Sequence, residues 1–227
     1  MPGWRAGLGT VRCVPDSPDS DDSQPDRPPV GDHYFTSEPA SADERRRLDV
    51  TLAGQRVRAW TAPGIFSPGR VDLGTQVLLR DVPPPPPDGD LLDLGCGWGP
   101  LALTMALTSP AARVWAVDVN RRSLDLLTRT AADHGLHGIR AVEPDGVPAD
   151  VRFAAIWSNP PIRVGKAALH GLLRRWLPRL TPDGAAYLVV QRNLGADSLH
   201  RWLVDDLGLP TDRVGSAKGF RVLRVTR

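Results

Sequence analysis

Residues 91–99 read Leu-Leu-Asp-Leu-Gly-Cys-Gly-Trp-Gly, and this stretch decides the fold. Its apolar start is typical of a short buried strand, and its glycines, Gly95, Gly97 and Gly99, indicate a turn. Glycine adopts positive φ at little cost and lets backbone N–H groups approach a ligand closely. We therefore expect a strand, a ligand-binding turn, and a helix that begins near Trp98 with its positively polarised end facing a ligand carboxylate.

Strands and helices alternate along the rest of the chain. The apolar runs are continuous, as in parallel strands that are buried on both faces. The last two strands have no helix between them, so the final one should run antiparallel. We predict an α/β fold with a Rossmann-like, seven-stranded, mostly parallel sheet and helices on both faces. The expected strands cover residues 91–92, 113–117, 139–142, 153–157, 185–190, 213–214 and 220–225, and the helices cover 98–107, 121–134, 166–177 and 197–207.

The spacing of the glycines indicates which ligand the turn binds. Ligands of open α/β sheets bind beyond the carboxyl ends of the strands, where this turn lies. A dinucleotide fingerprint needs glycines at relative positions 1, 3 and 6, but the sixth position here is Pro100. The pattern Gly-x-Gly-x-Gly fits S-adenosylmethionine and not NAD. We expect cofactor contacts from Asp93, Gly95, Cys96, Gly97 and Gly99.

Two further carboxylates follow the next two strands. Asp118 is expected to accept hydrogen bonds from both ribose hydroxyls; the alternative is a cap for the helix at Arg121, which Asn120 could supply alone. Asp145 is expected to accept the adenine amino group, with an ordinary Asp-Gly turn as the alternative. We count Asp118, Asn120 and Asp145 as candidate cofactor-binding residues.

The sequence Asn159-Pro160-Pro161 follows the fourth strand and carries the predicted chemistry. The prolines fix φ and remove backbone donors, so they keep the Asn side chain still and expose carbonyls. The Asn159 side-chain oxygen and the Pro160 carbonyl can accept both N–H bonds of an amine on a planar ring and turn its lone pair toward the methyl group. Such positioning contributes on the order of 7–11 kcal/mol. The alternative is a tight turn without chemistry.

Asn159 is therefore a candidate for both catalysis and cofactor contact, and Pro160 and Pro161 are candidates for catalysis. On sequence alone, Asn159→Asp keeps the acceptor oxygen and is expected to retain more activity than Asn159→Ala.

With these motifs, the chain resembles the "methyltransferase small domain" family of class I S-adenosylmethionine-dependent methyltransferases. It is most similar to bacterial enzymes that methylate guanine N2 in 16S ribosomal RNA. In the position after the prolines, where protein-glutamine and adenine methyltransferases usually carry a stacking aromatic, this chain has Ile162. That favours the guanine subfamily and leaves open what the base stacks on. The matching pieces are His33–Thr36, Gly64–Ser67, Asp72–Thr75, Asp93–Gly99, Ser158–Lys166 and Gly219–Leu223.

Composition divides the chain into four parts. Residues 1–32 are rich in Pro, Ser and Asp and are expected to be a disordered acidic arm. Residues 33–82 should form a β-hairpin around Ala53-Gly54 and a helix capped by Asp72. Residues 83–88 are a proline linker, and residues 89–227 are the methyltransferase core that binds the cofactor.

Basic residues flank the expected site and suit a partner with phosphates, and the family resemblance implies that this partner is RNA, from the small ribosomal subunit. Residues 1–44 carry a net charge of −6, and since the whole chain carries +2, the remainder carries +8. Clustered arginines suit phosphate contacts, although a solvated helix face is the alternative. The candidates for RNA binding are Arg163, Lys166, Arg174, Arg175 and Arg221, and Arg179 follows the expected helix 166–177.

The bulk features set further expectations. No run approaches the roughly 20 apolar residues of a membrane helix, and the first 14 residues lack an apolar stretch of signal-peptide length. Cys13 and Cys96 cannot make a disulfide framework. We expect a cytoplasmic enzyme with no membrane partner and no metal. Transfer to a protein amide or a small molecule, or a non-catalytic RNA-binding module, remain as alternatives.

Overall fold

The computed structural model describes residues 38–227. The expected acidic arm and the stretch His33–Thr36 lie outside the described residues.

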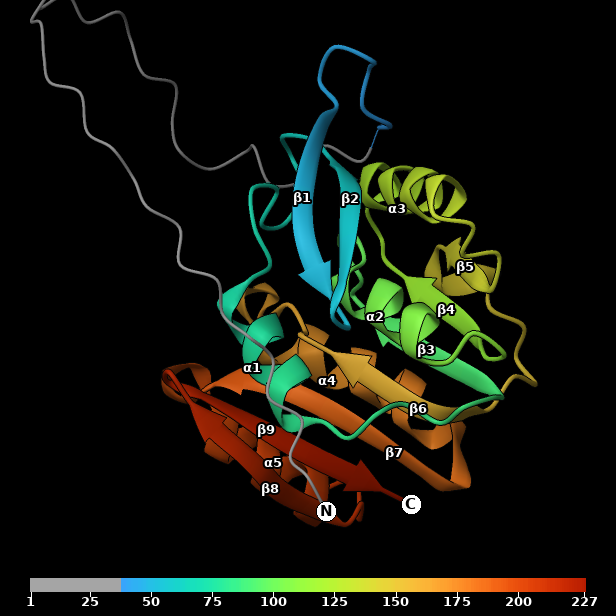
Figure 1. Cartoon of the computed structure of the whole chain (residues 1–227). Coiled ribbons are helices and arrows are strands. Elements are labelled where there is room, and N and C mark those ends of the chain that lie inside the picture. Colours follow the sequence, from blue (N-terminus) through green and yellow to red (C-terminus); the bar gives the residue numbers. More distant parts are fainter. Residues whose placement is uncertain (1–37) are drawn as a thin grey trace, which may run out of the picture.

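A seven-stranded mixed sheet forms the centre of the molecule (Figure 1), with strand order β5-β4-β3-β6-β7-β9-β8. The first five of these strands are parallel, and β9 runs antiparallel to both of its neighbours. This confirms the predicted sheet and its antiparallel last strand. The strands are β3 (Asp90–Leu94), β4 (Arg113–Val117), β5 (Ile139–Val142), β6 (Phe153–Ser158), β7 (Leu180–Gln191), β8 (Thr211–Ala217) and β9 (Phe220–Thr226).

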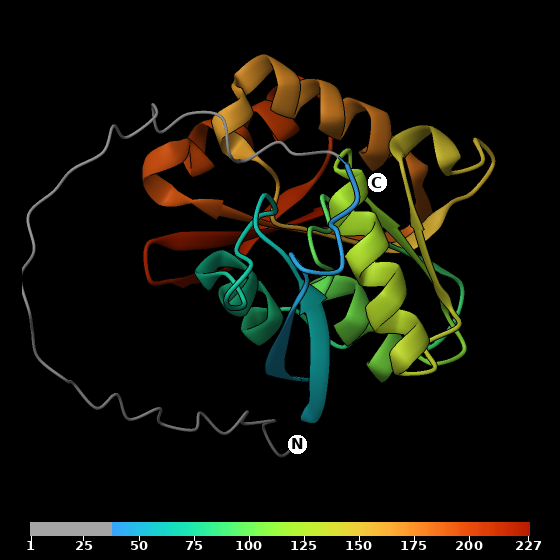
Figure 2. The ribbon, with the colours of Figure 1, turned by 90° about the horizontal axis from the view of Figure 1, so that it is seen from above.

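Helices cover both faces of the sheet (Figures 1 and 2). Residues of α1, α2 and α3 share one buried cluster, whereas α4 and α5 contribute to a second cluster on the other face. The helices are α1 (Leu73–Asp81), α2 (Pro100–Thr108), α3 (Arg121–Asp133), α4 (Lys166–Trp176) and α5 (Ala196–Asp205), with short 3₁₀ turns η1 (Pro144–Gly146), η2 (Ile162–Val164), η3 (Leu177–Arg179) and η4 (Arg192–Leu194).

Helix α2 begins two residues later than the sequence predicts. Gly99 caps it with a left-handed φ of 90°, and Pro100 occupies the first helical position. Proline suits that position because its missing N–H would have no partner within the helix. Trp98 therefore belongs to the glycine turn and not to the helix.

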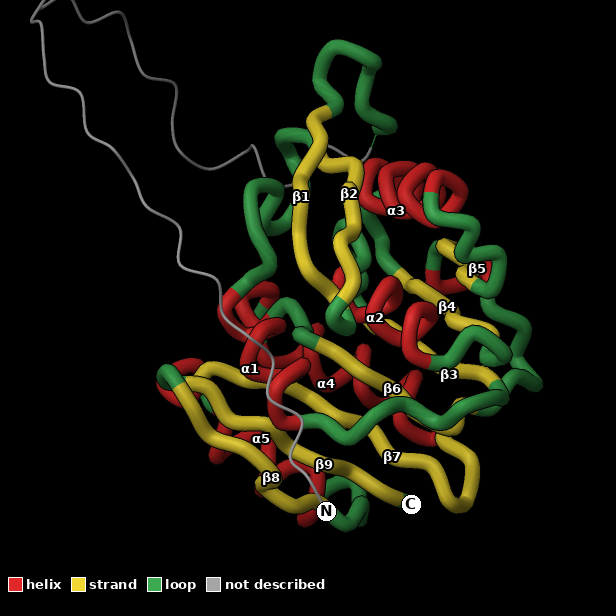
Figure 3. Tube along the Cα trace, viewed as in Figure 1, coloured by secondary structure: helices red, strands yellow, loops and turns green. Residues whose placement is uncertain are grey.

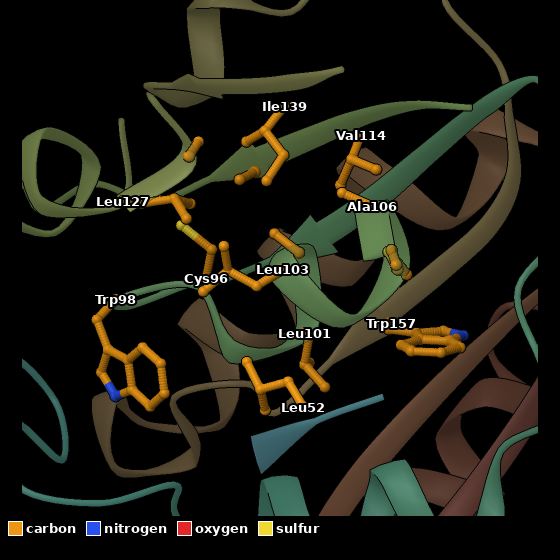
Figure 4. Packing of buried hydrophobic residues seen from close by; sticks show 14 of the residues in the cluster. Leu52, Cys96, Trp98, Leu101, Leu103, Ala106, Val114, Leu127, Ile139 and Trp157 are labelled. Atoms are coloured by element: carbon orange, nitrogen blue, oxygen red, sulfur yellow. The ribbon is translucent and has the colours of Figure 1, made fainter. Parts of the chain in front are cut away.

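A β-hairpin precedes the sheet, as predicted, and consists of β1 (Arg46–Leu52) and β2 (Gln55–Thr61). Ala53 and Gly54 both adopt positive φ, 49° and 75°, which matches the twist of a two-residue hairpin turn. The hairpin packs on α3, where the Trp60 backbone N–H donates to Thr130 Oγ1 at 2.9 Å. Figure 4 shows Leu52 with residues of α2 in one cluster, so the hairpin shares the core of the sheet.

From the hairpin, residues 62–72 form a loop that leads down to α1 (Figure 3). The Asp72 side chain caps α1 by accepting from the N–H groups of Gly74 (2.8 Å) and Thr75 (3.4 Å), as predicted. Trp98 Nε1 donates to the Ser67 carbonyl at 3.2 Å and fixes the loop against the glycine turn. Among the described residues, no helix has the length and apolar character needed to cross a membrane.

Candidate active site

The glycine turn leaves β3 with Gly95 at φ 77° and Gly97 at φ 54°. The N–H groups of Gly95 and Cys96 both donate to the Val117 carbonyl, at 2.8 and 3.1 Å. These N–H groups therefore hold the turn against β4 and are not free for a ligand. A Cβ on Gly97 would meet no atom within 4 Å, so the turn leaves open space there for a ligand.

Gly99 has a different role. A Cβ there would lie 2.3 Å from Leu127 Cδ1, so its missing side chain permits α2 to pack on α3. The cofactor contact predicted for Gly99 stays a prediction, whereas the packing requirement is direct.

Asp93 is a fully buried carboxylate below the turn. Its Oδ2 accepts from the Ala102 N–H at 2.9 Å, but its Oδ1 has no hydrogen-bond partner. Burial, reinforced by the nearby charge of Asp118, raises the pKa of Asp93 to about 8. A buried acceptor without a partner costs free energy, so this atom fits a ligand that brings a donor or a positive charge.

Asp118 follows β4 and is tied to the same turn. Its carboxylate accepts from the N–H groups of Gly97 (2.8 Å) and Asn120 (2.9 Å). Burial raises the pKa of Asp118, and these two bonds partly offset that effect. A carboxylate has about four acceptor positions, so capacity for two hydroxyl donors remains.

Asn120 supplies the helix cap that was the alternative role for Asp118. Its side chain accepts from the Ser123 N–H at 3.2 Å and caps α3, and its Nδ2 donates to the Gly64 carbonyl at 3.3 Å. The cofactor contact predicted for Asn120 stays a prediction, and its side chain already has two protein partners.

The Asn159 loop lies directly beside the glycine turn. Strand β6 pairs in parallel with β3, with Ser158 opposite Leu94, and Ser158 Oγ donates to the Leu94 carbonyl at 2.7 Å. The residues that follow each strand are therefore neighbours, and a Cβ on Gly95 would lie 3.8 Å from Pro161 Cδ. The register of two strands brings together motifs that are about sixty residues apart in the sequence.

Helix α1 fixes the amide of Asn159. The Asn159 Nδ2 donates to Asp72 Oδ2 at 2.8 Å and to Thr75 Oγ1 at 3.1 Å. An amide has two N–H donors and one carbonyl oxygen. Since Nδ2 has partners on the N-cap and first turn of α1, the side-chain oxygen Oδ1 is the part of the amide that remains as an acceptor.

The glycine turn, Asp93, Asn159 and the start of α1 line one pocket. Four of its lining residues come from the loop before α1 and from α1 itself, and sequence reasoning gave three of them no role and Asp72 only that of a cap. Their only signal was that they fall in Gly64–Ser67 and Asp72–Thr75, two of the stretches that carry the family resemblance. The lining residues are Phe66, Ser67, Asp72, Thr75, Asp93, Gly95, Cys96, Gly97, Trp98, Pro100, Leu101 and Asn159.

A family model described as "Methyltransferase small domain" matches residues 56–224. The chain belongs to the methyltransferase small domain family.

Similar proteins include bacterial ribosomal RNA methyltransferases. The uncharacterized protein YbxB of Bacillus subtilis is 27% identical over 201 residues, which is 87% of this chain and 100% of YbxB. Ribosomal RNA small subunit methyltransferase C of Pseudomonas aeruginosa (strain LESB58) is 34% identical over 188 residues, which is 80% of this chain and 54% of that protein. The chain thus spans about half the length of this relative.

A solved structure has the same fold. The T. thermophilus 16S rRNA N2 methyltransferase RsmC, in complex with AdoMet and guanosine, superposes with a TM-score of 0.72 at 26% identity. The match covers 83% of this chain and 52% of that one.

Outside the pocket, two of the predicted site residues, Arg175 and Asp145, form an ion pair with each other. Arg175 Nη2 donates to Asp145 Oδ1 and to the Pro144 carbonyl, both at 2.7 Å. The Asp145 side chain is 93% exposed, and an exposed ion pair contributes at most about 1 kcal/mol. A ligand or RNA could therefore separate the pair at little cost.

The other basic candidates differ in how free they are. Lys166 and Arg174 are exposed on α4, although the Arg174 guanidinium also lies 5.2 Å from the centre of the Trp202 ring. Arg221 is largely buried and pairs with Asp197. Arg179 donates to the Val151 carbonyl and stacks over Trp176. Arg163 belongs to η2.

Proposed function

We propose that this protein is an S-adenosylmethionine-dependent methyltransferase that methylates the exocyclic N2 amine of a guanine in small-subunit ribosomal RNA. The observation that carries the proposal is the Asn159 amide in the lining of the pocket beside the glycine turn, whose Nδ2 donates to Asp72 and Thr75 and so leaves its oxygen as the atom available to a substrate. An acceptor at this place suits a substrate that donates, such as an aryl amine. The names of the relatives, which act on 16S ribosomal RNA, support the same substrate.

The pocket suits the amino acid end of the cofactor, and Asp118 and Asp145, which do not line it, would contact the remainder. The unpartnered Asp93 Oδ1 and the open space at Gly97 suit a ligand with a cationic amino acid end. Asp118 would hold the ribose hydroxyls, and Asp145 would receive the adenine amino group. When bound, S-adenosylmethionine supplies an electrophilic methyl group on a positively charged sulfur.

The protein's own part in the reaction is to hold the amine. Asn159 Oδ1 and the Pro160 carbonyl accept hydrogen bonds from the two N–H groups of the amine. These bonds turn the lone pair of the amine out of the plane of the ring. No strong base is required, because the amine becomes acidic only as the new bond to the methyl group forms; the methylated amine would then release one proton to water, and the neutral thioether would be the leaving group. Fixing the reactants in line accounts for the rate, as for other reactions accelerated by orientation. A ribosomal RNA substrate would place the enzyme in the cytoplasm.

Methyl transfer from labelled S-adenosylmethionine tests the proposal. The protein is incubated separately with small ribosomal subunits, with naked ribosomal RNA and with ribosomal protein, and modified nucleosides are identified by mass spectrometry. We expect label in N2-methylguanosine from RNA, and about 100-fold slower labelling with Asn159→Ala. Label in protein, in N6-methyladenosine, or in no macromolecule would overturn the assignment.

A further inference from the structure

The N-terminal end of α1 contacts the reaction centre from outside the sheet. We propose that Asp72 and Thr75 are positioning residues that lock the Asn159 amide with its oxygen toward the substrate. This inference rests on the proposed function, because it assigns how that site obtains its acceptor.

The clamp consists of two hydrogen bonds on a rigid support. Asn159 Nδ2 donates to Asp72 Oδ2 at 2.8 Å and to Thr75 Oγ1 at 3.1 Å. The same Asp72 oxygen accepts from the N–H groups of Gly74 (2.8 Å) and Thr75 (3.4 Å), so the helix terminus itself holds the carboxylate in place. Thr75 is only 3% exposed, which protects its bond from water.

Close packing holds the same contact together. A Cβ on Gly74 would lie 3.0 Å from both Asp72 Oδ2 and Phe220 Cε1, and 3.3 Å from Asn159 Nδ2. The start of α1 thus lies against the Asn159 loop and against β9, and a side chain at Gly74 would push the three apart. The missing side chain permits the short clamp distances.

The clamp matters because the side-chain amide of Asn159 can rotate by about 180°, which exchanges its oxygen and its NH₂ group with almost no change in shape. In the rotated form Asn159 would point its oxygen at the Asp72 carboxylate and its N–H bonds at the substrate. Two acceptors facing each other repel, and an N–H donor cannot hold an amine through its N–H bonds. The Asp72 and Thr75 acceptors therefore select the one rotamer that binds a donor substrate.

Two substitutions of Asp72 separate the clamp from the helix cap. Serine and asparagine both cap helices well, but only asparagine places an oxygen as far out as the aspartate does. With Asp72→Ser we expect methyl transfer to fall about tenfold or more while cofactor affinity stays within about twofold. Asp72→Asn should stay within about threefold of wild type, since the acceptor is kept. Equal activity of the two variants would show that Asp72 serves only as a cap and would overturn the inference.

Thr75 provides a second pair in case the first disturbs the helix. Thr75→Val removes the acceptor at nearly constant shape, whereas Thr75→Ser keeps it. The valine variant should lose turnover with an unchanged RNA KM, and the serine variant should not. In the Asn159→Ala background, Asp72→Ser should cause no further loss, because Asp72 acts through Asn159. A further loss there would contradict the clamp.

An NMR measurement separates this inference from the proposed function. The side-chain amide protons of Asn159, assigned with Asn159→Ala, should exchange slowly with solvent in the free protein and faster in Asp72→Ser than in Asp72→Asn. Unchanged exchange in Asp72→Ser would overturn the clamp whatever the enzyme methylates. Failure of the wild type to methylate any RNA, with this exchange pattern intact, would overturn the proposed function alone.

Discussion

The Nδ2 group of the Asn159 amide is bonded to the start of α1, so only the oxygen of the amide is free. Its N–H groups donate to Asp72 and Thr75, so a substitution at this position removes contacts with the helix terminus as well as the proposed contact with the substrate.

Asn159→Ala should leave cofactor affinity within about twofold and lower methyl transfer about 100-fold, the usual cost of deleting one preorganised polar group at a reacting centre. Single-turnover rates with bound RNA, set beside calorimetry with the cofactor, measure the two effects. A wild-type rate in this variant would mean that the amide does not hold the amine.

Asn159→Asp reverses the expectation drawn from sequence alone. The new carboxylate would face Asp72, whose Oδ2 lies 2.8 Å from the present Nδ2, and like charges at that distance repel. We now expect activity no higher than that of Asn159→Ala. Adding Asp72→Asn supplies a donor and should restore part of the rate. If the single variant is more active than the alanine variant, the Asp72 contact has no influence on the reaction.

Asp93 should make cofactor binding depend on pH. Its pKa of about 8 in the free protein means that it is largely protonated at neutral pH, and a cationic ligand beside Oδ1 favours the carboxylate. Binding then releases a proton, so affinity should rise from pH 6 toward about 8 and level off above that. Calorimetry in buffers of different ionisation enthalpy measures the proton. Asp93→Asn should abolish the dependence, and a pH-independent wild type would contradict it.

The same group should affect the stability of the free protein with the opposite slope. Its pKa in the fold lies above the ordinary 3.8, so the contribution to stability is complete below that value and is lost as pH rises through about 8. The melting temperature of the wild type should therefore fall more steeply over this range than that of Asp93→Asn. Parallel curves would show that burial does not perturb Asp93.

At the scale of elements, the glycine turn contains two glycines that are needed for different reasons. Gly99→Ala would place a Cβ 2.3 Å from Leu127 at φ 90°, and overpacking with a left-handed backbone should cost about 2–4 kcal/mol of stability. Gly97→Ala meets no neighbour and should cost about 1–2 kcal/mol, yet it should weaken cofactor binding more. Urea denaturation and calorimetry compare the two. Equal stability losses would contradict this division.

The helices and strands also show how much of the structure can be predicted from the sequence. Strand–helix alternation was enough for the sheet, because short continuous apolar runs such as Phe153–Trp157 are typical of strands covered on both faces. It also placed the glycine turn and Asn159 at one edge, since parallel strands end together. It could not show that Asp72 reaches Asn159, or that Asp145 pairs with Arg175, because such contacts depend on long-range packing of loops.

At the scale of the whole molecule, the hairpin and α1 are part of the same body as the sheet. Leu52 and Leu78 are buried in the cluster that contains Leu103 and Leu126. Asp81 lies so close to β8 that a Cβ on Gly215 would be 2.1 Å from its Oδ2. Removing the extension would therefore expose one face of the sheet and open the pocket.

RNA binding should weaken as the salt concentration rises, and only some of the candidate basic residues should contribute to this dependence. Lys166 and Arg174 are exposed, whereas Arg179 and Arg221 already have protein partners. Replacing the exposed pair by alanine should lower the slope of log K against log salt by about 1–2, the counterion release of two phosphate contacts. Fluorescence anisotropy with labelled RNA measures the slope. An unchanged slope would mean that RNA does not contact this part of α4.

The contact between the start of α1 and Asn159 also has a consequence for the order of events while the chain is being synthesised. Its partners are 87 residues apart, so during synthesis Asp72 must wait for the whole of β3 through β6 to emerge. A chain halted before Asn159 already has the glycine turn and Asp118, and so most of the residues proposed to hold the cofactor. If Asn159 holds the amine as proposed, a growing chain gains that acceptor only after β6 has been made and can pair with β3, so methyl transfer would be acquired after most of the proposed cofactor-binding residues are in place.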